Sequence, residues 1–160
     1  MEKELSFYKF YHQNIINKWI HLFCIPMIII SIIIYLDNFY ILYEKFVYKG
    51  RFRRTYYKFK LISFILIYYI FFYFKIGIIV GIMMTIYFYI LINFAYLLID
   101  FLPEDFVTKI AHIMFVSGWI LQFIGHFIEG RKPALLDSIS QAFFQAPLFS
   151  LEFIFPFLFT

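Results

Sequence analysis

The stretch IGIIVGIMMTIYFYILINFAYLLI, residues 76–99, decides the fold class of this chain. It contains no charged side chain and no proline, and it is longer than the roughly 20 apolar residues that a helix needs to cross a bilayer. Three further apolar runs lie at 22–42, 61–74 and 106–128. The run at 61–74 is short for a membrane-spanning helix, whereas the other two have the required length. If all four runs cross, successive connections lie on alternate sides of the membrane.

The overall composition excludes a soluble protein. Hydrophobic residues make up 64% of the 160 positions and aromatic residues 26%, far more than a soluble domain of this size can bury. We therefore predict an all-α fold with a single domain, residues 1–160, built as a polytopic membrane helical bundle. Four to five spans are expected, together with an N-terminal amphipathic helix within residues 1–20. The segment 134–160 either crosses the membrane or forms one or two short helices at its interface.

The net charge of +4 arises largely from one stretch, residues 43–60, in which Lys and Arg are interleaved with aromatic residues. Nucleic-acid-binding segments show a similar pattern, but the position between two apolar runs favours a loop that touches anionic lipid headgroups. Membrane lipids are therefore expected partners and nucleic acid is not. Because Lys and Arg lie on both sides of the predicted bundle in similar numbers, the positive-inside rule does not fix its orientation.

The densest polar chemistry stands at the end of the last long run, in the string GHFIEGRKPA at residues 125–134. Ionisable side chains at this depth are costly and usually face a protein interior or an aqueous cavity. His126 and Glu129 share one helical face, and Arg131 and Lys132 follow directly. An arginine in particular suits the capture of a carboxylate. The alternative is a helix end whose charged side chains extend to the headgroups.

Two more histidines precede the first run. On one straight helix His12 and His21 would point to opposite faces. Asn14 and Asn17 between them are good N-cap residues and poor residues for a helix interior, so we expect a short helix to end near His12 and the next to begin near Asn17. Counting spans then brings both histidines to the membrane face that carries His126. Three imidazoles and a nearby carboxylate suit zinc or non-haem iron.

The fourth histidine, His112, is not expected to belong to this site. Along a continuous helix it lies roughly 21 Å from His126, so one ion cannot contact both residues. A hydrogen-bonded histidine between helices is its expected role.

Two signatures in the chain resemble a known family. The N-terminal signature is the pattern Y-x3-H-x4-N-x3-H-x4-P at residues 8–26. The C-terminal signature is GWxxQFIGH at residues 118–126, followed by EGRKPALLD at 129–137. Together they resemble the 2-hydroxy-fatty-acid dioxygenases, a family once known as domain of unknown function 962, and the resemblance covers nearly the whole chain.

This resemblance implies an Fe2+-dependent dioxygenase, a multi-pass protein of the endoplasmic reticulum membrane. Its partners would be dioxygen and a long-chain 2-hydroxy fatty acid, which it would shorten by one carbon through α-oxidation in phytosphingosine and sphingolipid degradation. The resemblance assigns the metal-ligand role to His12, His21 and His126. It leaves the oligomeric state open.

Three charged residues beside His126 are the predicted catalytic residues. Glu129 would ligate the metal or hydrogen-bond a ligating histidine, and Arg131 and Lys132 would neutralise the substrate carboxylate. The chain departs from the family at one point, since relatives usually show four positions from the histidine to the glutamate and this chain shows three. A non-catalytic membrane lipid-binding or scaffold protein of the same fold is therefore the alternative function.

Overall fold

Five helices, a 3-10 turn and a two-stranded antiparallel sheet form the part of the chain that the structure describes. The structure is a computed structural model, and it describes residues 12–37, 40–44, 57–137 and 139–156. The predicted all-α class is confirmed. Residues 1–11 of the expected amphipathic helix and residues 45–56 of the basic stretch lie outside the described residues. The elements are α2 (Ile15–Leu36), β1 (Tyr40–Glu44), β2 (Tyr57–Lys60), α3 (Leu61–Ile76), α4 (Ile78–Phe101), α5 (Glu104–Glu129), a 3-10 turn (Ala134–Leu136) and α6 (Ile139–Ile154).

Three of these helices are long and apolar enough to cross a membrane, namely α2 with 22 residues, α4 with 24 and α5 with 26. The helices α3 and α6 have 16 residues each, which is about 24 Å of helix against a hydrocarbon core of about 30 Å. Of the four to five predicted spans, three therefore have the full spanning length. The segment after α5 forms a turn and one short helix.

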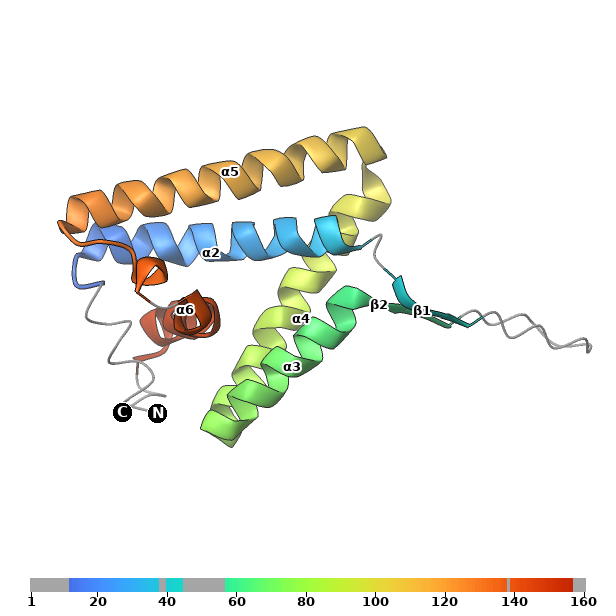
Figure 1. Ribbon diagram of the computed structural model, residues 1–160, viewed down its shortest axis with the longest axis horizontal. Helices are drawn as coiled ribbons and strands as arrows, with labels where there is room; N and C mark the ends of the chain where they lie inside the picture. The colour runs from blue at the N-terminus through green and yellow to red at the C-terminus, as the bar shows by residue number, and fades with distance from the viewer. Residues whose placement is uncertain (1–11, 38–39, 45–56, 138, 157–160) are drawn as a thin grey trace, which may run out of the picture.

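The helices α2 and α5 run antiparallel and lie side by side (Figure 1). Small residues of α5 let the two backbones approach closely. A Cβ added to Gly118 would lie 2.8 Å from Cγ1 of Ile28, and one added to Gly125 would lie 2.3 Å from Oδ1 of Asn17. Both distances are too short for a carbon contact, so this packing of α5 on α2 requires glycine at the two positions.

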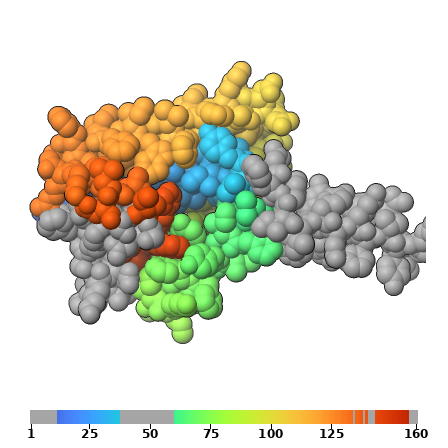
Figure 2. All heavy atoms as spheres, viewed as in Figure 1, coloured from blue at the N-terminus to red at the C-terminus, as the bar shows by residue number. Residues whose placement is uncertain are grey.

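The helices α3 and α4 form a second pair, which is joined at Gly77 and inclined to the first (Figure 1). The helix α6 packs against both pairs, and the hydroxyl of Tyr73 on α3 donates a hydrogen bond to the carbonyl of Phe144 at 2.8 Å. Figure 2 shows α2 set back between α5 and α3 on this face of the molecule. The buried core where the elements meet includes Ile33, Leu66, Tyr73, Met84, Phe88, Ala95 and Leu148.

The strands β1 and β2 pair antiparallel between α2 and α3, with Tyr40 opposite Lys60 and Glu44 opposite Tyr57. Lys60 forms an ion pair with Asp37, which directly follows α2. This ion pair ties the start of α3 to the end of α2 that lies away from His21.

Candidate metal centre

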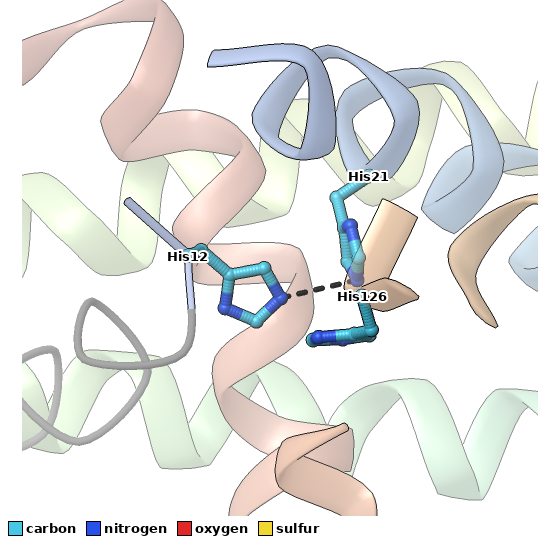
Figure 3. A group of neighbouring side chains, drawn as sticks. All are labelled: His12, His21 and His126. Carbon is cyan, nitrogen blue, oxygen red and sulfur yellow. Dashed lines mark hydrogen bonds between the residues drawn. The ribbon is translucent and has the colours of Figure 1, made fainter. Parts of the chain in front are cut away.

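Three histidines from distant parts of the chain converge in one cluster (Figure 3). Nε2 of His12 lies 3.1 Å from Nε2 of His21, and the ring of His126 has its centroid 4.8 Å and 4.9 Å from the other two. Each ring offers one nitrogen within 4.8 Å of the other two. The exposed fractions of the three residues are 1%, 1% and 5%. The convergence that was predicted by counting spans is confirmed, and we call these residues the histidine cluster.

The chain turns between His12 and His21 because a helix begins there. His12 and Gln13, the described residues before Asn14, have no regular secondary structure. Asn14 has extended backbone angles, φ −71° and ψ 130°, and its side chain accepts a hydrogen bond of 2.8 Å from the N–H two residues further on. The predicted break is confirmed, although α2 begins directly after Asn14 rather than near Asn17. His12 therefore folds back against the first turns of α2.

Glu129 holds the segment that carries His12. Its carboxylate accepts hydrogen bonds from the backbone N–H of Gln13 at 2.8 Å, from that of Asn14 at 2.8 and 3.0 Å, and from Nδ2 of Asn17 at 3.2 Å. A negative charge is also favourable at the N-terminus of a helix, here α2. These are the contacts of a residue that positions the segment carrying His12. The catalytic role of Glu129 stays a prediction.

Gly130 explains why α5 ends at Glu129. Its backbone is left-handed, with φ 70° and ψ 22°, a conformation that favours glycine. The N–H groups of Gly130 and Arg131 bond back to the carbonyls of Phe127 and His126 at 3.1 and 3.2 Å, as in a common helix terminus. The carboxylate of Glu129 is thereby placed at the very end of α5, beside the start of α2.

The separation of His12 and His21 and the donor set of the cluster fit a first-row transition metal. Two nitrogens on one ion with metal–nitrogen bonds of about 2.1 Å lie roughly 3.0–3.4 Å apart, and His12 and His21 are separated by 3.1 Å. Nδ1 of His21 lies 3.0 Å from the carbonyl oxygen of Asn17, which can only accept. Nδ1 therefore carries the proton, and Nε2 keeps its electron pair for an ion. Among the described residues Nδ1 of His126 has no hydrogen-bond partner although it is buried. Imidazole ligands suit iron, zinc, copper and nickel.

Two cavities reach the histidine cluster. The first, which we call the apolar groove, has a volume of about 130 Å³ and is lined by His21 and His126 together with apolar side chains of all five helices. The second, the polar cavity, is lined by residues that include His12, Gln13, Lys18, Phe149 and Glu152. The cluster therefore contacts an apolar space through two of its rings and a polar one through the third.

The two cations predicted to bind a carboxylate make other contacts. Nη2 of Arg131 donates a hydrogen bond to Oε1 of Gln13 at 3.2 Å, and Lys132 forms an ion pair with Asp137. Neither residue is among the described residues that line the two cavities. Their role towards the substrate stays a prediction.

Sequence reasoning did not single out Lys18, which lines the polar cavity beside His12. A signal for it was available, because a helix that begins after Asn14 places Lys18 and His21 on neighbouring positions of one face. It also missed the contact of Asn17 with Glu129. For that contact no local signal exists, because the partners are far apart in the sequence.

His112 lies apart from the cluster, as predicted, but its hydrogen bond is made within its own helix α5 and only its ring contact reaches α2. Its Nδ1 donates a hydrogen bond to the carbonyl of Thr108 at 2.7 Å. Its ring packs edge-on against Tyr35 of α2, with 5.2 Å between centroids.

Known proteins identify the family of the chain. Residues 1–157 match the family described as 2-hydroxy-palmitic acid dioxygenase Mpo1-like. The chain is 34% identical over 157 residues to the 2-hydroxy-palmitic acid dioxygenase MPO1 of Saccharomyces cerevisiae, and the alignment covers 97% of this chain and 80% of that protein. No solved structure matches it. The chain therefore belongs to the 2-hydroxy-palmitic acid dioxygenase Mpo1-like family.

Proposed function

We propose that this protein is an Fe2+-dependent dioxygenase that carries out the α-oxidation of long-chain 2-hydroxy fatty acids and shortens them by one carbon. The observation that carries the proposal is the cluster of His12, His21 and His126, buried at the head of an apolar groove. The related protein of Saccharomyces cerevisiae bears the name of a dioxygenase for such a substrate. Three buried imidazoles provide a site for iron, and the groove provides a space for a hydrocarbon chain.

The residues of the cluster would hold the ion through ring nitrogens. When bound, Fe2+ supplies the redox chemistry with dioxygen and the positive charge that attracts the oxygen atoms of a 2-hydroxy acid. The carbonyl of Asn17 keeps the proton of His21 on Nδ1, so that Nε2 faces His12 as an electron-pair donor. Glu129 orders the segment of His12 through its backbone N–H contacts. The apolar walls of the groove keep water away from the substrate chain.

The substrate carboxylate needs a cation near the cluster. Lys18 supports this part of the proposal, since its half-buried side chain lines the same cavity as His12. Arg131 and Lys132 remain further candidates on the same side of the molecule, at the end of α5.

The proposed setting is the endoplasmic reticulum membrane, where the enzyme would act in phytosphingosine and sphingolipid degradation. Three helices of spanning length support a multi-pass membrane protein. The family resemblance is the basis for the compartment and for the degradation route. A substrate that is dissolved in the bilayer gives a physical reason for an enzyme embedded there.

The test is purification under anaerobic conditions, followed by metal analysis and an assay with 2-hydroxypalmitate and dioxygen. We expect iron to bind in the wild type and the product to be one carbon shorter. The variant His126→Ala should lose both, whereas the matched control His112→Ala, which alters a histidine of the same helix, should keep both. Wild-type protein that binds no metal and leaves 2-hydroxypalmitate unchanged would favour the alternative of a lipid-binding or scaffold protein.

A further inference from the structure

We propose that the apolar groove binds the acyl chain of the substrate and that its far end, formed by Ile62, Leu66 and Phe88, limits the length of that chain. The inference rests on the proposed function, because it takes the head group of a 2-hydroxy fatty acid to lie at the histidine cluster.

The α2 wall of the groove is one continuous stripe. It consists of His21, Ile25, Ile28, Ile29, Ile32 and Ile33, whose spacing places them on one face of the helix. From His21 to Ile33 this stripe covers about 18 Å. The groove therefore leads away from the cluster along the helix over a distance that suits a long acyl chain.

The α5 wall starts in the same way. Trp119, Gln122, Phe123 and His126 line the groove, and their spacing again corresponds to one helical face. Each wall thus begins at a histidine of the cluster. A chain in the groove would have one end at the site of the metal, and this continuity is what identifies the occupant as the substrate rather than a separate lipid.

The chemistry and the size of the groove agree with a hydrocarbon chain. Apart from the two histidines, Gln122 and Tyr69, the lining consists of apolar side chains. A polar ligand would leave its hydrogen-bonding groups without partners in such a space. The volume of the groove is about 130 Å³. Because a water molecule needs roughly 10–15 Å³ of such cavity volume, the groove has room for about ten groups of the size of a water molecule.

At Ile33, the lining residue of α2 farthest along the helix from His21, the groove borders the buried core of the protein. The lining residues Ile33, Ile62, Leu66 and Phe88 have exposed fractions of 1%, 5%, 9% and 3%. They come from α2, α3 and α4, and all four belong to the buried core. A longer acyl chain would have to displace these packed side chains, which is costly in a close-packed interior.

The position of the chain is tested by photo-crosslinking with the full-length wild-type protein. The probe is 2-hydroxypalmitate with a diazirine at its terminal carbon, bound in the absence of dioxygen. We expect the label on Ile62, Leu66 or Phe88. Label on the outward-facing residues of the same helices, such as Ile67 and Tyr89, which are 64% and 66% exposed, would overturn the proposal.

The limit on chain length is tested by filling the groove at two depths. Ile29→Trp and Ile32→Trp should lower kcat/KM for long substrates relative to short ones by roughly fourfold for each methylene that no longer fits. Because Ile29 lies nearer the histidine cluster than Ile32, Ile29→Trp should prefer shorter substrates than Ile32→Trp does. The matched control Phe23→Trp alters an exposed residue of the same helix and should keep the wild-type profile.

The experiments distinguish a failure of the proposed reaction from a failure of the proposed acyl site. Labelling in the groove without any turnover of 2-hydroxypalmitate would contradict the proposed reaction and leave the acyl site intact. Turnover with an unchanged chain-length profile in both tryptophan variants would overturn the acyl site and leave the reaction intact. If the variants do not fold, the labelling of the wild type decides by itself.

Discussion

Removing the carboxylate of Glu129 should weaken metal binding without touching a metal ligand. In Glu129→Ala the backbone N–H groups of Gln13 and Asn14 lose their acceptor. A hydrogen bond to a charged group contributes about 1.5–3 kcal/mol, but Gln13 is exposed and water replaces part of the loss. We expect a cost of about 2 kcal/mol for ordering the segment of His12, which corresponds to a roughly 30-fold lower affinity for Fe2+.

The measurement is a metal competition titration with a chromogenic chelator under anaerobic conditions, with Co2+ as a second, spectroscopically visible ion. Glu129→Gln, which keeps one acceptor oxygen, should give an intermediate loss. Glu104→Ala serves as the control, because it removes a carboxylate from the opposite end of the same helix. Wild-type affinity in Glu129→Ala, or an equal loss in Glu104→Ala, would refute the positioning role.

Three further outcomes are expected. Gly125→Ala places a Cβ 2.3 Å from Oδ1 of Asn17 and should lower both the melting temperature and the metal affinity, whereas Gly77→Ala, which meets no atom within 4 Å, should change neither in the same thermal and metal titrations. Lys18→Met should raise KM for 2-hydroxypalmitate about tenfold, as expected for the loss of roughly 1–2 kcal/mol at a half-buried ion pair, and steady-state kinetics should show a smaller change for Lys132→Met. Treatment with a chelator should abolish product formation in a mass-spectrometric assay, and Fe2+ should restore it.

The sequence predicted what depends on local composition and spacing. Apolar runs predicted the helices, and α4 covers nearly the whole of the run at 76–99. The N-cap preference of Asn14 and Asn17 predicted the break before α2. The meeting of His12 and His21 with His126 followed from connectivity alone, because successive antiparallel helices return the chain to the same end of the bundle.

Properties that depend on packing between helices were not predictable in this way. The runs at 22–42 and 61–74 are equally apolar on all faces, so their sequences do not show which side forms a groove. Only the inclination of the α3–α4 pair against α2 and α5 turns the stripe from His21 to Ile33 into a groove wall. The partners of Glu129 were hidden for a related reason, since they are backbone N–H groups, which carry no sequence signature.

The hydrogen bonds of Glu129 with the start of α2 explain why Glu129 stands three positions after His126. With about 100° of rotation per residue, Glu129 lies about 40° from Gly125 around α5 and His126 about 100° from it. Gly125 faces α2, where it contacts Asn17, so three positions after the histidine direct the carboxylate to the first turn of α2. A fourth position would lie about 140° from Gly125 and point past the histidine instead.

The last turn of α5 therefore connects all three rings of the cluster. His126 belongs to that turn itself, and Glu129 orders the segment that carries His12. Asn17 receives the contacts of both Gly125 and Glu129, and its carbonyl accepts the hydrogen bond from His21. Because one helical turn contacts the surroundings of all three histidines, a change at any of its positions should affect the proposed metal site as a whole. Measured effects of Gly125 and Glu129 variants on metal affinity should accordingly be non-additive in a double-mutant cycle.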